Sequence, residues 1–205
     1  MKNLRPALLT ATLLLAGCAS SGSHPDNTTT SNWWNPVSWS WSSLAPWNWF
    51  GSSLEVSEQG VGGINSMTAL QETAIEQGLG GRYTLRKGMR MESGSVVSFW
   101  QALDDNQVKM ELSGDSTVSR IVVMDADVAT EKGVTLGTPF SDLYSKAFNA
   151  CQKGSGVDGQ NIECTAPGSQ HIHYIFSGDW HGPEGLMPSD DTLQNWTLSK
   201  IIWQR

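Results

Sequence analysis

Alternating apolar and polar positions predict a series of β-strands between residues 83 and 203. The clearest pair is 96–103 and 107–112, which Asp104-Asp105-Asn106 joins as a hairpin. In the second strand of this pair, apolar residues alternate with Lys109 and Glu111, so one face is buried and the other is wet. The same reasoning predicts further strands at 83–85, 117–124, 172–176 and 196–203.

Two other stretches have apolar residues at the spacing of an amphipathic helix. In the first, Thr68 and Gln71 form a capping box ahead of a helix that ends at the glycines after Leu79. In the second, Thr138 is the predicted N-cap and Pro139 the first helical residue. An unbroken apolar stripe then follows, made of Phe140, Leu143, Tyr144, Ala147, Phe148 and Cys151.

Short echoes raise the question of an internal repeat. Residues 118–122 reappear as 198–202, and Gly63-Ile64 ahead of Thr68 parallels Gly133-Val134 ahead of Thr138. An echo of five residues arises by chance as readily as by duplication, so both explanations stay open. Strands and helices together predict a single α+β domain over 52–205. Two main helices would pack on its antiparallel sheet, with two related halves as the open alternative.

The N-terminal residues 1–17 have the parts of a secretory signal, and their end decides where the rest of the chain resides. Two basic residues precede an apolar run over 7–16, which is too short to span a bilayer. Leu15-Ala16-Gly17-Cys18 resembles the bacterial lipoprotein signal, in which the cysteine is acylated and begins the mature protein. The resemblance implies a lipid anchor and, with Ala19 next, the outer membrane. The alternative is an ordinary secretory signal with an incidental Cys18.

Two segments of unusual composition separate this signal from the predicted domain. Residues 18–32 are rich in Ser, Thr and Asn, which predicts a disordered tether. Residues 33–51 carry no charge and are dense in tryptophan, whose indole favours the headgroup level of a bilayer. We therefore expect a membrane-proximal segment, although the same rings could instead pack on the domain. The six tryptophans are Trp33, Trp34, Trp39, Trp41, Trp47 and Trp49.

Net charge and cysteine content exclude some classes of function and predict a disulfide. The formal net charge is −7, and it becomes −9 without 1–17, because Lys2 and Arg5 are the only charged residues removed. An acidic chain lacks the basic footprint of a nucleic-acid-binding protein. In an oxidising compartment Cys151 and Cys164 predict a disulfide, with two free thiols as the alternative. Two cysteines at this spacing are too few for a zinc site.

The connection over 177–192 is the most promising surface for recognition, because its length is typical of functional loops. Its partner-binding candidates are Trp180, Glu184, Leu186 and Met187. A carboxylate pair made of Glu184 with Asp179 or Asp190 is the alternative, which would suit hydrolysis of envelope glycans. His171 and His173 precede the loop, but their pattern is too loose to predict a metal site, and we expect neither metal nor cofactor.

Three motifs resemble the sigma-E-regulated lipoprotein family of enterobacteria, whose domain has no known function. They are Pro46–Gly51, Gly137–Tyr144 and Gly182–Pro188, and the similarity extends from the signal to the final Trp-Gln-Arg. The resemblance implies an outer-membrane lipoprotein that faces the periplasm and is made during envelope stress. We therefore predict a non-enzymatic lipoprotein, held to the bilayer at Cys18, that binds or braces an envelope protein or glycan. An enzyme acting on peptidoglycan or polysaccharide is the alternative.

Overall fold

A computed structural model describes residues 54–92, 94–183 and 185–205. All of these lie in one compact unit, Ala45–Arg205, and the second unit is Met1–Leu44. The predicted signal, the tether and the tryptophan-rich segment therefore lie outside the described residues. Within the described ranges, no helix combines the length and the apolar character needed to cross a membrane.

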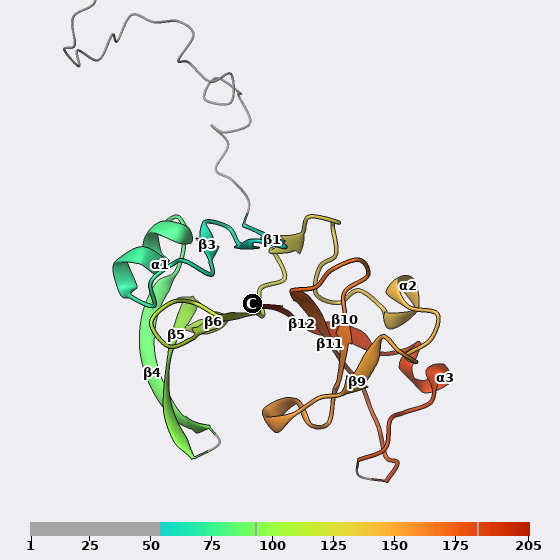
Figure 1. The fold of residues 1–205 in the computed structure, drawn as a ribbon. Coiled ribbons are helices and arrows are strands. Elements are labelled where there is room, and N and C mark those ends of the chain that lie inside the picture. The colour runs from blue at the N-terminus through green and yellow to red at the C-terminus, as the bar shows by residue number, and fades with distance from the viewer. Residues whose placement is uncertain (1–53, 93, 184) are drawn as a thin grey trace, which may run out of the picture. The chain divides into compact units, whose positions relative to one another are not determined.

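Strands account for most of the regular structure (Figure 1). Three short strands and a helix come first: β1 (Glu55–Ser57), β2 (Gly60–Val61), β3 (Ile64–Asn65) and α1 (Glu72–Gly78). Five strands follow: β4 (Thr84–Glu92), β5 (Ser95–Asp104), β6 (Gln107–Ser113), β7 (Arg120–Val123) and β8 (Ala129–Thr130). The chain continues through α2 (Phe140–Leu143), β9 (Cys151–Lys153), the 3₁₀ turn η4 (Gly156–Asp158), β10 (Ile162–Thr165), β11 (Ile172–Ser177), α3 (Asp190–Leu193) and β12 (Thr197–Gln204).

An eight-stranded antiparallel sheet forms the framework, in the order β4-β5-β6-β7-β12-β11-β10-β9. It consists of two four-stranded meanders, which we call the first meander (β4–β7) and the second meander (β9–β12). Their final strands, β7 and β12, pair antiparallel at the middle of the sheet, with Val122 opposite Ile202. The two echoed segments, 118–122 and 198–202, therefore meet only at their last residues, Val122 and Ile202.

The backbone hydrogen bonds just before α1 and at the start of α2 follow the same pattern. The N–H of Leu70 donates to Ser116, and that of Val118 donates back to Thr68. At the corresponding points of the second meander, Phe140 donates to Trp196 and Leu198 donates to Thr138, with all four distances between 2.8 and 3.0 Å. Each helix is therefore tied at its start to the chain that leads into the last strand of its meander.

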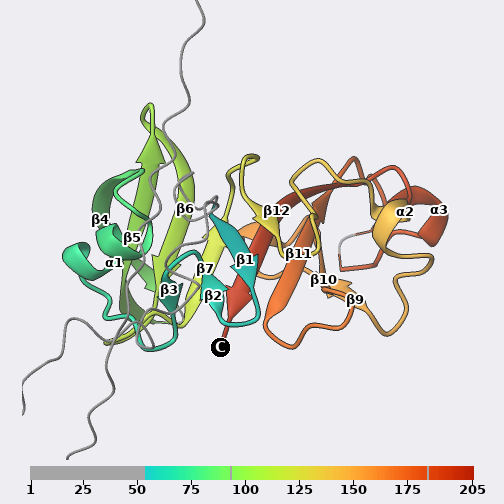
Figure 2. The ribbon, with the colours of Figure 1, turned by 90° about the horizontal axis from the view of Figure 1, so that it is seen from above.

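A second, small sheet in the order β3-β2-β1-β8 packs against the middle of the large sheet (Figures 1 and 2). Its pairs are antiparallel except β1 with β8, which is parallel. Val56 and Val61 from the small sheet join Ile121 and Ile201 from the large sheet in one buried cluster. The indole N–H of Trp203 also donates to the carbonyl of Glu58, 3.0 Å away, and so links the two layers.

The prediction of an α+β domain with two main helices is wrong, because the described residues are mostly β-structure. Only α1 reaches seven residues, and α2 and α3 have four each. The core is formed between one face of the large sheet and the small sheet, with the short helices at its margin. The positions that bury apolar side chains therefore lie mainly on strands.

The largest single error is the helix predicted over 139–151. It stops at Leu143, because Tyr144 adopts an extended conformation and packs its ring on Phe140 and Phe176. Further on, the N–H of Ala147 donates to the side chain of Asp190 rather than to a helical carbonyl. The apolar stripe is only partly buried, since Phe148 is 81% exposed.

The other local predictions agree better with the structure. The hairpin at 96–112 is present, and both Asp105 and Asn106 have the positive φ angles that a tight two-residue hairpin turn demands. The strands predicted at 172–176 and 196–203 are also present. The first helix begins near the predicted position, but Thr68 does not cap it. Its hydroxyl instead accepts the N–H of Asn65.

Candidate ligand-binding trough

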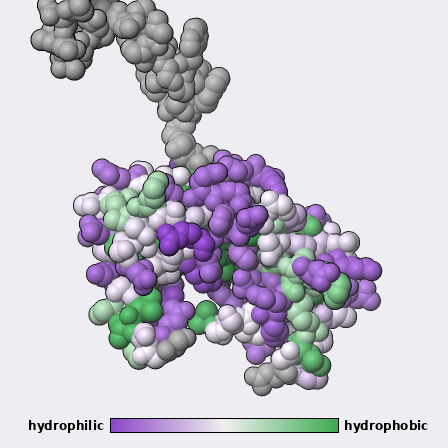
Figure 3. All heavy atoms as spheres, in the orientation of Figure 1, coloured by the Kyte–Doolittle hydropathy of each residue, from purple (hydrophilic) through white to green (hydrophobic). Residues whose placement is uncertain are grey.

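A hollow of about 630 Å³ lies on the face of the large sheet that points away from the core. We call it the trough. Its floor comes from β6, β7 and β12, one wall from the end of β4, and the opposite wall from the turn that carries η4. Figure 3 shows the surface hollowed between the lower ends of these two walls. Both meanders thus contribute to one site.

Strand alternation explains why charged residues gather there. Met110 and Leu112 enter the core, so Glu111 between them points to the other face, as do Arg120 beside Ile121 and Lys200 beside Ile201. The charged residues that line the trough are Arg90, Arg120, Lys200, Glu92, Glu111 and Asp158. Its apolar lining is Met91, Val122, Met124 and Val157.

Two of the three cations are held by acidic partners. The guanidinium of Arg90 forms ion pairs with Glu111 and Glu92 and lies over the ring of Phe99, 4.9 Å from its centre. The ammonium of Lys200 lies 2.7 Å from the carboxylate of Asp158. The hydrogen bond that Arg90 donates to Glu111 raises the pKa of the Arg90 guanidinium, so Arg90 is cationic at every physiological pH.

Arg120 differs from both, since it forms no ion pair with any described residue. Its Nε atom is buried and has no hydrogen-bond acceptor within the described ranges. A buried donor without an acceptor costs about 1–3 kcal/mol. Of the three cations in the trough, Arg120 is therefore the one available to an anion.

The wall formed by the end of β4 is positioned by a close contact between the backbone of Gly88 and the ring of Phe99. Gly88 lies opposite Phe99 in the β4–β5 ladder, and a Cβ at Gly88 would come within 2.4 Å of the Phe99 ring. Only glycine lets this ring lie across β4, where it supports the Arg90 guanidinium. The end of β4 beyond it is exposed, with Met89 at 71% and Met91 at 67%.

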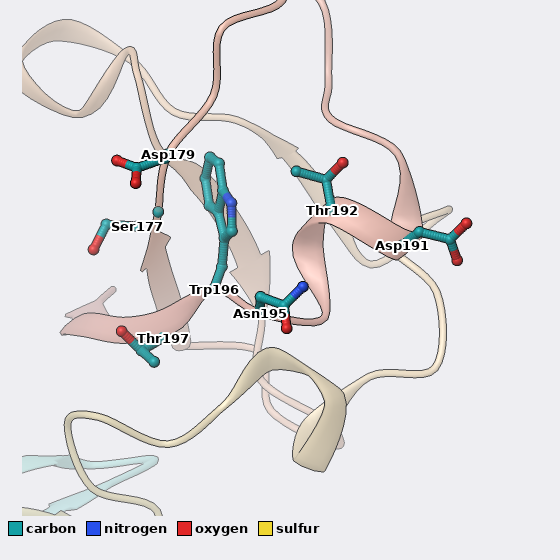
Figure 4. A pocket seen from close by; sticks show the side chains of 8 residues that line it. Ser177, Asp179, Asp191, Thr192, Asn195, Trp196 and Thr197 are labelled. Carbon is teal, nitrogen blue, oxygen red and sulfur yellow. The ribbon is translucent and has the colours of Figure 1, made fainter.

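A second hollow, of about 640 Å³, lies at the base of the predicted recognition loop (Figure 4). It is lined by Ser177, Asp179, Asp191 and Thr192 together with Trp196, which is itself only 2% exposed. Gly178 allows that contact, because a Cβ there would lie 2.3 Å from the Trp196 ring. This hollow is wide and shallow, and its lining among the described residues includes no Lys or Arg beside the two carboxylates.

The loop 177–192 does not present its apolar residues together. Trp180 and Met187 pack against the core, whereas Leu186 is 56% exposed. The Nε1 atom of Trp180 is buried without an acceptor in the described part of the chain. Glu184 lies outside the described residues. Recognition by this loop stays a prediction, and its exposed apolar contact is Leu186.

The carboxylates considered for catalysis have separate surroundings. Asp190 accepts the N–H of Ala147 at 2.8 Å, so it joins α3 to the segment after α2. Asp179 and Asp191 line the shallow hollow. His173 pairs with Glu163 at 3.3 Å, and His171 contacts the carbonyl of Gln204. Among the described residues, no group of three or more His, Cys, Asp or Glu side chains is arranged to hold a metal.

The predicted disulfide is confirmed: Cys151 and Cys164 are bonded. They lie opposite each other on the neighbouring strands β9 and β10, and Cys164 is fully buried. The bond therefore joins two strands at the edge of the sheet, because Cys151 lies on β9 and not at the end of the helix predicted over 139–151. Cys18 and the six tryptophans proposed for the membrane interface lie outside the described residues.

Comparison with known proteins identifies the family. The model of a protein family of unknown function, DUF1131, matches residues 38–205, and the chain belongs to this family. The uncharacterized protein YfeY of Escherichia coli strain K12 is 52% identical over 206 residues, covering all of both chains. The crystal structure of the uncharacterized protein YfeY from Escherichia coli has 56% identity and a TM-score of 0.69. The match covers 74% of this chain and 99% of that one.

Proposed function

We propose that this protein is an outer-membrane lipoprotein, acylated at Cys18, that faces the periplasm and binds an envelope component without chemical turnover. The anchor rests on the Leu15–Cys18 motif and the apolar run before it. Production during envelope stress rests on the resemblance to sigma-E-regulated lipoproteins. Two or more acyl chains hold a protein stably at a bilayer, whereas one chain binds only marginally.

The observation that carries the proposed location is the disulfide between Cys151 and Cys164. Such bonds persist in oxidising compartments such as the bacterial periplasm and are rare in the cytosol. The bond lies in the folded part of the chain and is independent of the signal motif, so the two observations support export separately.

The proposed binding role rests on the trough. Its size falls within the range of pockets that take small ligands, and it combines apolar lining with a cation, Arg120, that has no acidic partner among the described residues. The carboxylates considered for glycan hydrolysis do not favour the enzymatic alternative, because Asp190 is engaged by the backbone of Ala147. We therefore propose binding alone.

Membrane fractionation of cells labelled with a palmitate analogue tests the anchor. We expect the wild-type chain to carry the label and to sediment with the outer membrane, and globomycin to accumulate its precursor. Cys18→Ala should abolish both the label and the sedimentation. The matched control Cys151→Ala/Cys164→Ala should keep both. A Cys18→Ala chain that is processed normally and stays membrane-bound would show the anchor assignment to be wrong.

The tryptophan-rich segment 33–51 is proposed to lie at the membrane surface. A tether of roughly 14 residues spans about 20 Å on average, so acylation at Cys18 would keep the indoles near the headgroups. Replacement of the six tryptophans by serine should remove the blue shift of tryptophan fluorescence that vesicles produce, and should leave the melting temperature unchanged. A large fall in melting temperature without a lipid response would assign the segment to the fold.

A further inference from the structure

The trough offers an anion one well-placed cation and surrounds it with a mixed lining. Arg120 lies on β7, a central strand of the sheet, so its backbone is held by pairs with Ser113 on one side and Gln204 on the other. Its guanidinium carries up to five donors in a fixed fork that suits a carboxylate. Arg120 also lines a smaller adjoining hollow, of about 270 Å³, so it stands where the two meet.

Size and lining together decide which class of anion fits. A volume of about 630 Å³ is far more than an inorganic ion needs and is typical of small-molecule pockets. The paired groups Arg90–Glu111 and Lys200–Asp158 would lose hydration beneath an alkyl chain, which disfavours a lipid. The same groups can donate to and accept from peptide amides. Met91 and Val157 supply apolar contacts on opposite walls, and Val157 is 94% exposed.

We propose that the trough binds the carboxyl-terminal end of a short peptide, with the terminal carboxylate on Arg120 and an apolar side chain between Met91 and Val157. Capture of a terminal carboxylate is an established mode of peptide recognition. The inference rests on the proposed binding role and names its ligand, but it does not depend on the anchor. A failure of acylation at Cys18 would therefore leave it intact.

The test uses the full chain carrying Cys18→Ala, incubated with an equimolar library of tetrapeptides made once as free acids and once as carboxyl-terminal amides. Bound peptides are identified by native mass spectrometry. We expect the free acids to be retained at least tenfold more than the amides, and those ending in an apolar residue to be enriched. Equal retention of acids and amides, or no retention of either, would overturn the proposal.

Variants assign the binding to the trough. Arg120→Gln removes the charge and should lower retention of free acids at least tenfold. Val157 lies on an exposed turn, so Val157→Asp should lower the retention of free acids without affecting folding. The matched control is Arg86→Gln, a cation on the same sheet face that lies outside the trough and donates to Gln101. It should bind like the parent chain. Equal retention by Arg120→Gln and Arg86→Gln would refute the assignment.

A spectroscopic readout keeps the test valid if Arg120→Gln unfolds. In the intact chain labelled with ¹⁵N-arginine, a bound carboxylate should shift the Nε–H resonance of Arg120 and leave that of Arg86 in place. Addition of the best library peptide without any shift at Arg120 would contradict the proposed contact.

Discussion

The two meanders share one hydrogen-bonding plan around their helices but are stabilised by different interactions. The first has long strands, of 9 and 10 residues in β4 and β5, and its end is exposed at Met89 and Met91. The second ends at the edge of the sheet in two short strands, β10 and β9, of 4 and 3 residues, which the Cys151–Cys164 bond joins. It also contains an aromatic cluster in which Phe176 meets Phe140 and Tyr144 at 5.2 and 5.8 Å. Short strands thus depend on side-chain packing, whereas long ones can project beyond the core.

The largest expected effect follows from the aromatic cluster. Phe176→Ala removes a fully buried ring and should lower the free energy of unfolding by about 3–5 kcal/mol. Phe99→Ala is the matched change in the first meander and should cost less, because that ring is only partly buried. Urea unfolding of both variants measures the difference. Equal losses would show that the second meander does not depend more on its aromatic packing.

The second-largest expected loss of stability comes from removal of the disulfide. Cys151→Ala/Cys164→Ala should destabilise the chain by about 3 kcal/mol, because a bond across 13 residues restricts the unfolded state. Thermal unfolding of the parent chain with and without a reductant should show the same loss, and the reductant should have no effect on the double variant. An unchanged melting temperature in the parent would mean that β9 needs no covalent link.

Tyrosine ionisation probes both meanders together. Burial raises the pKa of Tyr83, Tyr144 and Tyr174 above the ordinary value, and Tyr83 also donates to Asp125 at 2.7 Å. The folded chain therefore holds more protons than the unfolded chain above about pH 10, so stability must fall as pH rises beyond that value. Absorbance at alkaline pH should show tyrosinate only as the chain unfolds.

Tyr83→Phe should reduce this dependence of stability on pH. It should also cost about 1–2 kcal/mol near neutrality, because Asp125 is buried and loses a hydrogen bond. If the stability of Tyr83→Phe falls with alkaline pH as steeply as that of the parent chain, Tyr83 does not contribute to this pH dependence. Tyr144 and Tyr174, which lie in the aromatic cluster of the second meander, provide the internal comparison.

The smallest effect concerns the contact between the small sheet and the second meander. A hydrogen bond from Ser169, helped by the N–H of Gln170, lowers the pKa of Glu58. Its contribution to stability is therefore present above pH 4.5 and lost as pH falls through the lowered value. Solvent screening should keep Glu58→Gln below about 1 kcal/mol at neutral pH. In denaturant unfolding, Glu58→Gln should lose more stability at pH 7 than at pH 3. A larger loss at pH 3 would contradict this role of Glu58.

The sequence predicted those parts of the fold that depend only on residues close together in the chain. The hairpin before and after Asp105-Asn106 was predictable, because alternation and turn residues agree over adjacent positions. The helix over 139–151 was not, because its stripe of apolar residues is buried in another conformation. Tyr144 packs on Phe140 while extended, and Asp190, which lies 43 residues away, binds the N–H of Ala147. Contacts at that distance in the sequence leave no mark on periodicity.

The trough was missed for a related reason. Lys109 and Glu111 do mark a polar strand face in the sequence, as does Arg120 beside Ile121. Whether these faces meet depends on strand order, and the decisive pair, β7 with β12, joins segments that no local rule connects. The disulfide, by contrast, was predictable from two cysteines and an export signal, although the strands that it joins were not.

The pairing of β7 with β12 also sets an order of assembly for the nascent chain. Val122 lies opposite Ile202, so about eighty residues must be available before this ladder can form. Until then the first meander exposes an unpaired edge, a template on which another chain can add a strand. Contacts between such distant segments form slowly. Closure of the large sheet is therefore expected to be the slow step of folding, with aggregation competing until β12 docks.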